Sequence, residues 1–297
     1  GTVDSFVGIA NPSQPITLSA DWLAVDAGLH NLPDGTQIEA RALSTITVRA
    51  GTTLSGAGDA GAGDEVTFVH DWNTAPGVLH SVQSQDDPEW ITSTAFGNSG
   101  TGSAPDVDGF TLTLEGAEVV FAHPSSGPAV AETIGWVAIS PGVGSVSDTA
   151  GTALAYDAGL TASTHVERHE VACVALPDSG AFGFSAVPYV LAKHNSMDGT
   201  NGSWVRSCEP TDASGNFLAS VTADNLYVHM DEDQVAQAER TGIPEYGAWF
   251  AIEPGGVITL TETDHDSDGV PTNDELGTDE QDPRIDSDSD GTFDYLD

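Results

Sequence analysis

The sequence predicts an all-β fold of two tandem antiparallel β-sandwich domains followed by an irregular C-terminal segment. Three observations support this prediction. Strand-like stretches of alternating or β-branched residues are separated by runs rich in Gly, Ser, Asp and Pro. Several phrases of the first half return in the same order in the second half. The last 34 residues, Asp264 to Asp297, hold thirteen acidic residues and too few apolar ones to build a core.

Strand patterns dominate the chain between these features. The clearest stretches are residues 36–50, 64–72, 109–122, 164–176 and 216–230. Gly51–Glu65 is rich in Gly and polar residues, which predicts a long flexible loop. Asp233–Gly242 is the single helix-like phrase, and a loop is the alternative there.

Four pairs of phrases indicate an internal duplication. The pairs are LAVDAGL (23–29) with LAYDAGL (154–160), DPEWITS with GSWVRSC, GFTLTLEGAEV with NLYVHMDEDQV, and ETIGWVAISPG with EYGAWFAIEPG. The last pair aligns Trp136 with Trp249, and the third aligns Leu112 with Val228. The expected divisions are an N-terminal strand or arm at 1–17, one sandwich at 18–142, a second at 143–257 and the C-terminal segment at 258–297.

The C-terminal segment repeats the ligand spacing of a twelve-residue calcium loop. From Asp264 as position 1, carboxylates fall at positions 1, 3, 5 and 12, and Gly269 falls at the turn position 6. The same spacing starts again at Asp286. Hard oxygen ligands without Cys favour Ca²⁺ over zinc. The two loops supply as ligands Asp264, Asp266, Asp268, the Val270 carbonyl, Glu275, Asp286, Asp288, Asp290, the Thr292 carbonyl, Asp294 and Asp297.

The flanks of these loops differ from those of an EF-hand, because they are too short and polar for paired amphipathic helices. The D-x-D-x-D-G loops and their Gly-Thr-Asp and Asp-Pro spacers resemble thrombospondin type 3 calcium repeats, in which the chain wraps around a row of ions. The resemblance implies a calcium-wrapped segment and adds Asp279 and Asp282 as spacer ligands. The alternative is a solvated acidic tail, which two phased copies of the loop argue against.

The first half also has a family likeness. HSVQSQDDPEWITSTAF, GFTLTLEGAE and ETIGWVAISPG, in this order, resemble the H-type-lectin-like β-sandwich modules of secreted bacterial proteins. The second half is more diverged, since it keeps WFAIEPGG but has KHNSMDGTNGSW where the first half has the VQ-x-x-DDP phrase. The resemblance implies the sandwich fold and makes glycans a candidate partner, without assigning sugar-contacting residues.

Charge excludes several classes of partner. The chain carries 46 acidic and seven basic residues, for a net charge of −39. Such a surface repels nucleic acids and anionic membranes and attracts cations. It fits a protein that binds divalent ions, a halophilic surface, or both. No run of eighteen apolar residues is present, so no membrane span is expected. Cys173 and Cys208 form either one disulfide or two buried thiols.

Aromatic residues fall into two groups. Trp136 and Trp249 lie in apolar phrases and are expected in the sandwich cores. Trp90 and Trp204 follow polar loops, so they are candidates for exposed contacts, with core packing as the alternative.

Catalytic chemistry has no specific signal in the sequence. His165, Glu167 and His169 would share one face of a strand, where they form either a weak metal clip or a solvated surface. No nucleophile elbow or phosphate loop is present. We therefore expect a protein that is not an enzyme.

Two functions remain. The first is an extracellular, cell-surface structural or adhesive protein, a subunit of a calcium-stabilised fibre or matrix that self-associates when Ca²⁺ removes the repulsion between subunits. The second is a secreted carbohydrate-binding, lectin-like protein whose tandem repeats give avidity. The apolar segment Thr2–Ala10 could complete a neighbour's sheet, and pairing within its own domain is the alternative.

Overall fold

The structure, a computed structural model, describes residues 23–49, 63–86, 91–100, 102–116, 130–168, 172–199, 203–232, 242–258 and 261–262. Within these ranges the chain forms strands, turns and loops and no helix, which confirms the predicted all-β class. Residues 1–17, residues 233–241 of the helix-like phrase and the calcium loops lie outside the described residues.

The described strands are short, as expected for segments interrupted by Gly, Pro and Asp. They are β1 (Gly28–Asn31), β2 (Gln37–Thr45), β3 (Val48–Arg49), β4 (Asp64–Thr67), β5 (Gly77–Val82), β6 (Ile91–Phe96), β7 (Gly109–Gly116), β8 (Glu132–Ile139), β9 (Gly142–Ser147), β10 (Ala153–Leu160), β11 (Val174–Leu176), β12 (Tyr189–His194), β13 (Ser203–Ser207), β14 (Leu226–Glu232), β15 (Gly247–Ile252) and β16 (Thr261–Glu262). β4 begins within the stretch predicted as a loop, because Asp64 and Glu65 pair with β7.

Four sheets arise from these strands. The first inner sheet has the order β16-β1-β2-β8-β5, and the first outer sheet has β3-β7-β4 with β6 also paired to β7. The second inner sheet has the order β12-β15-β10-β9, and the second outer sheet has β11-β14-β13. The ladders are antiparallel as predicted, except that β3 pairs parallel to β7.

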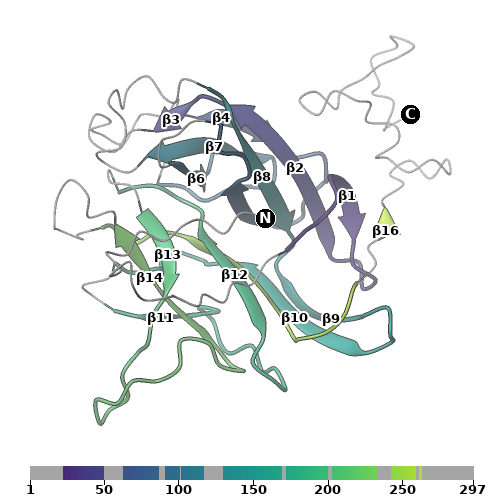
Figure 1. Ribbon diagram of the computed structural model, residues 1–297, viewed down its shortest axis with the longest axis vertical. Coiled ribbons are helices and arrows are strands. Elements are labelled where there is room, and N and C mark those ends of the chain that lie inside the picture. Colours follow the sequence, from purple (N-terminus) through teal and green to yellow (C-terminus); the bar gives the residue numbers. More distant parts are fainter. Residues whose placement is uncertain are drawn as a thin grey trace, which may run out of the picture.

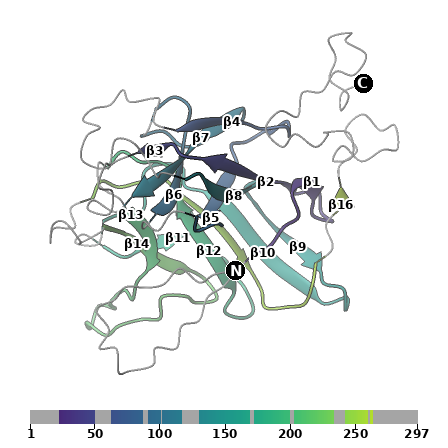
Figure 2. The same cartoon turned by 45° about the horizontal axis from the view of Figure 1, so that its top comes forward.

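The sheets stack as four layers, because each inner sheet is apolar on both faces. On β8, Trp136 and Ala138 pack toward the first outer sheet, whereas Ile139 packs toward the second inner sheet. On β15, Trp249 packs toward the second outer sheet and Phe250 toward the first inner sheet. Side chains that alternate along a strand therefore serve two different cores. Figures 1 and 2 show the first half, in purple to blue, against the second, in teal to green.

A shared core joins the two halves. Its first-half members are Leu32, Ile38, Leu79 and Ile139, and its second-half members are Val146, Leu154, Tyr156, Ala158, Ala248 and Phe250. Backbones come close here, since a Cβ on Gly77 would lie 2.5 Å from the carbonyl oxygen of Gly159. The expectation of tandem sandwiches did not include this third core, which makes the described halves one packed body.

Matching registers relate the two inner sheets. Leu79 of β5 lies opposite Val137 of β8, as Leu191 of β12 lies opposite Phe250 of β15. The order β1-β2-β8-β5 thus corresponds to β9-β10-β15-β12. The outer sheets correspond as well, because β4, β7 and β6 have the pairing of β11, β14 and β13.

One of the repeated phrases is misleading. Ile38 in β2 lies opposite the end of β8, and Tyr156 in β10 lies at the equivalent position opposite the end of β15. The counterpart of residues 154–160 is therefore 36–42, and the likeness of 154–160 to 23–29 is a chance match. Residues 23–27 precede β1 and form no strand.

The segment that follows the second half pairs with a strand of the first half. β16 pairs with β1, with Glu262 opposite His30 and Thr261 opposite Asn31. The chain that leads toward Asp264 therefore leaves from the edge of the first inner sheet.

Candidate functional site

None of the predicted calcium ligands lies among the described residues. These are Asp264, Asp266, Asp268, Val270, Glu275, Asp279, Asp282, Asp286, Asp288, Asp290, Thr292, Asp294 and Asp297. Trp90 and His169 also lie outside the described residues. The described body offers a different candidate, an open pocket on the second inner sheet.

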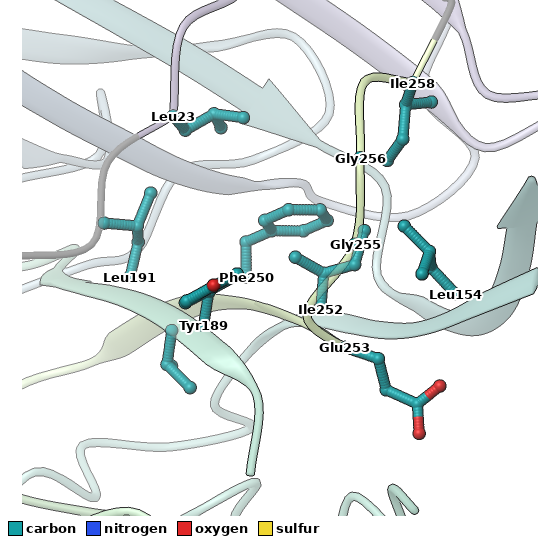
Figure 3. Close-up of a pocket in the computed structure, with 11 residues that line it drawn as sticks. Leu23, Leu154, Tyr189, Leu191, Phe250, Ile252, Glu253, Gly255, Gly256 and Ile258 are labelled. Carbon is teal, nitrogen blue, oxygen red and sulfur yellow. The ribbon is translucent and has the colours of Figure 1, made fainter. Parts of the chain in front are cut away.

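The pocket is an apolar hollow of about 490 Å³. Its walls come from β10, β12, β15, the chain after β15, and the chain just before β1 (Figure 3). The lining residues are Leu23, Leu154, Tyr189, Val190, Leu191, Phe250, Ile252, Glu253, Gly255, Gly256 and Ile258. The size falls within the roughly 300–1,000 Å³ typical of binding pockets.

Strand pairing positions the floor of the pocket. Tyr189 lies opposite Ile252, and Leu191 lies opposite Phe250, so these four side chains share one face of the sheet. Phe250 belongs to the core between the inner sheets, whereas Tyr189 is 51% exposed. The pocket is therefore the place where the shared core reaches the surface.

Glycines let the chain pass close to the pocket wall. A Cβ on Gly255 would lie 2.4 Å from the methyl carbons of Leu154, so a larger residue there would force the Leu154 side chain to move. The sequence Pro254-Gly-Gly thus brings Ile258 back over the sheet. The WFAIEPGG phrase shapes the pocket.

Glu253 is the one charged residue in the lining. Its Oε1 accepts hydrogen bonds from Ser185 Oγ (2.6 Å) and Ser185 N (2.7 Å), and its Oε2 accepts one from Ala155 N (3.1 Å). These bonds, the Ser185 hydroxyl first, lower the pKa of Glu253. The carboxylate is thus already hydrogen-bonded to groups of its own chain. The pocket suits apolar side chains better than a sugar or an ion.

A buried polar cluster fastens the two halves near the other end of β12. Nδ1 of His80 accepts from Ser93 Oγ at 2.9 Å, and its Nε2 donates to the carbonyl of His194 at 3.3 Å. Thr94 Oγ1 bonds His194 Nε2. Burial, assisted by the charge of Lys193, lowers the pKa of His80 far below its usual value and that of His194 to about 3. Both rings are neutral and buried, so we assign them a structural role.

A serine–glutamate pair occurs at the same place in both halves. Ser84 donates to the buried carboxylate of Glu132, and Ser196 donates to that of Glu245. Ser84 is part of the VQ-x-x-DDP phrase, so the structure shows that its counterpart in the second half is the Ser196-Met-Asp phrase. The two glutamates begin the repeated phrases ETIGWVAISPG and EYGAWFAIEPG. Their serine partners were not predicted from the sequence, although the similar spacing of 48 and 49 residues could have revealed them.

Glu245 is held by more donors than one. Its Oε1 accepts from the backbone nitrogens of Asp198 (2.8 Å) and Gly199 (2.9 Å). Burial nevertheless dominates and raises the pKa of Glu245 to about 7. Because the loop 196–199 lies over this group, we assign Glu245 to loop anchoring and not to proton transfer.

Cys173 and Cys208 form a disulfide with a Cα–Cα distance of 5.9 Å, which decides between the two alternatives left by the sequence. His229 lies beside them, and the three ligand atoms fall within 4.8 Å of one another. Cysteine binds a metal ion as the thiolate, which the disulfide removes. In the oxidised protein this group stabilises the second outer sheet and its neighbouring loops.

The remaining candidates take structural positions. Trp136 and Trp249 are buried in the two outer cores as predicted. Trp204 is half-buried, and the guanidinium of Arg206 lies 5.7 Å from its ring centre. His165 bonds the carbonyl of Ala175 at 3.0 Å through Nε2. Among the described residues the only metal-type cluster contains neither His165 nor Glu167.

Comparison of the chain with protein-family models, curated proteins and solved structures found no match. In the described part of the chain, no helix is long and apolar enough to cross a membrane.

Proposed function

We propose that the protein is an extracellular, calcium-binding structural or adhesive protein and a subunit of a calcium-stabilised cell-surface assembly. The observation that carries the proposal is the pair of phased D-x-D-x-D-G loops beginning at Asp264 and Asp286. The resemblance to thrombospondin type 3 repeats supports it.

The described body suits such a role. Its four sheets are joined by three apolar cores, so load applied at one sheet reaches the others through packed side chains. The Cys173–Cys208 bond adds a covalent link and fits an oxidising environment. The net charge of −39 on each chain opposes contact between subunits. Bound Ca²⁺ lowers that charge where ions bind.

The lectin-like alternative has less support. It relies on the resemblance of the first half to H-type-lectin-like modules. The open pocket is mainly apolar, and its only carboxylate is already bonded to Ser185 and Ala155. Sugar recognition requires several free polar groups, and we therefore favour the structural role.

Calcium calorimetry tests the proposal. We expect Ca²⁺ to bind the intact chain, and Asp266→Ala and Asp288→Ala each to remove the binding of one loop. Asp212→Ala is the matched control, because Asp212 is an acidic loop residue whose carboxylate bonds within its own turn, to Ser214 N and Asn216 N. Equal binding by the double variant and the intact chain would overturn the loop assignment.

A further inference from the structure

We propose that the apolar pocket of Figure 3 receives the segment Thr2–Ala10 of a second copy of this chain. The inference rests on the proposed function, because it names the surface that joins subunits within the assembly. Three features of the molecule carry it: the low charge of both surfaces, the exposed apolar side chains at the end strand beside the pocket, and the place where the N-terminal chain reaches the body.

Charge is the first feature. Two chains that each carry a charge of −39 repel one another over most of their surface. Thr2–Ala10 (TVDSFVGIA) contains one acidic residue, Asp4, and the pocket lining contains one, Glu253. These two surfaces can therefore approach at little electrostatic cost and bury apolar area, which is the main source of affinity between proteins.

The end strand beside the pocket is the second feature. β12 is the last strand of the second inner sheet in the described part of the chain, with the pocket floor on one of its faces. An extended segment laid along this floor would place Val3, Val7 and Ile9 on one face together with Ser5, because side chains alternate along a strand. That face can cover the pocket floor, while Asp4 and Phe6 fall on the opposite face.

Apolar side chains at and just before β12 are exposed, as expected if a segment of another chain covers them. Tyr189 is 51% exposed and Val187 is 55% exposed, although the first lies in a strand beside a buried core and the second lies two residues before that strand. Large apolar side chains gathered at a pocket and a sheet end typically mark an interaction site.

The position of Leu23 is the third feature. Leu23 lines the pocket, so the preceding chain starts at its rim (Figure 3). Residues 11–22 separate Leu23 from Ala10 and include Pro12 and Pro15. A residue before proline favours an extended or turn conformation, and twelve extended residues reach about 40 Å. The segment can therefore leave its own rim and enter the pocket of the next copy.

Cross-linking tests the contact and its direction. A chain with Val7→Cys is mixed with a differently tagged chain with Tyr189→Cys, under mild oxidation. We expect disulfide-linked pairs that contain both tags. If a chain carrying both substitutions yields only internally linked monomers, the segment fills its own pocket and the inference is wrong. An absence of any link overturns it as well.

A peptide measurement keeps the test independent of assembly. The probe is a labelled peptide of residues 1–10, titrated against a chain that lacks them, with calcium and with a chelator. We expect saturable binding in both, weakened at least about tenfold by Leu191→Asp or by Val7→Asp in the peptide. Phe217→Asp is the control, because Phe217 is 73% exposed and does not line the pocket.

The two proposals can fail separately. Peptide binding without calcium-dependent assembly would refute the proposed function and keep the docking site. Calcium-dependent assembly of a chain to which the peptide does not bind would refute the docking site alone.

Discussion

Asn195 pairs with the backbone of Val78 as though it were a residue of a neighbouring strand. Its Oδ1 accepts from Val78 N at 2.9 Å, and its Nδ2 donates to Val78 O at 2.7 Å. Both residues are fully buried, and they belong to different halves of the molecule. The bond pair thus joins the edge of the first inner sheet to the end of β12.

Asn195→Ala should lower the free energy of unfolding by about 2–5 kcal/mol, because it leaves two buried backbone groups without partners. Urea denaturation followed by tryptophan fluorescence measures the change. Asn216→Ala is the control, since Asn216 is exposed and bonds only within its own loop, and it should cost less than about 1 kcal/mol. Equal costs for both variants would contradict the fastening role of Asn195.

Glu245 should make the protein less stable as the pH rises from about 4.5 to about 7. Its pKa in the folded state is raised to about 7, so over this window the folded state holds a proton that the unfolded state has released. The loss amounts to about 3 kcal/mol in total. Glu245→Gln should remove this slope from a series of urea curves.

Glu253→Gln is the matched control for Glu245. Hydrogen bonds from Ser185 lower the pKa of Glu253, so its contribution is present at neutral pH and is lost as the pH falls. The two variants should therefore change the pH dependence in opposite senses. A slope that survives in Glu245→Gln would show that another group causes it.

His194 should weaken the protein in acid. Its pKa is lowered to about 3 by burial, so below about pH 6.5 the unfolded state binds a proton that the folded state does not. The free energy of unfolding should fall by up to about 1.4 kcal/mol for each pH unit between 6.5 and 3. His194→Gln should reduce this dependence, and the part that comes from His80 should remain. Thr94→Val removes the bonded hydroxyl but leaves the imidazole, and the dependence should remain.

The disulfide should contribute about 3–4 kcal/mol, because it closes a loop with a sequence separation of 35 residues. Thermal unfolding of a Cys173→Ser, Cys208→Ser variant measures the loss, and a reducing agent should reproduce it in the intact chain. If added reductant instead raises the affinity for zinc, and His229→Ala abolishes that binding, the pair also serves as a metal site in the reduced state.

Local patterns predicted part of this fold well. The alternation around Trp136 and Trp249 placed both rings in cores, because a strand's faces follow directly from its sequence. The likeness of residues 23–29 to 154–160 failed for the opposite reason. A short phrase says nothing about its partner strand, and pairing placed 36–42 at that position.

Contacts between distant residues could not be predicted in this way. The bonds of Asn195 to Val78 span 117 residues, and nothing near Asn195 in the sequence marks its partner. The pocket likewise depends on Leu23 and Ile258 meeting the sheet that contains Phe250. The serine–glutamate pairs were more accessible, since they repeat with similar spacing in both halves.

Imaging of the purified protein tests the central claim most directly. Negative-stain electron microscopy is carried out on one preparation with millimolar calcium and again after a chelator is added. The loops beginning at Asp264 and Asp286 predict ordered assemblies with calcium and dispersed subunits with the chelator. Single subunits in both conditions, or assemblies unchanged by the chelator, would contradict a calcium-stabilised assembly.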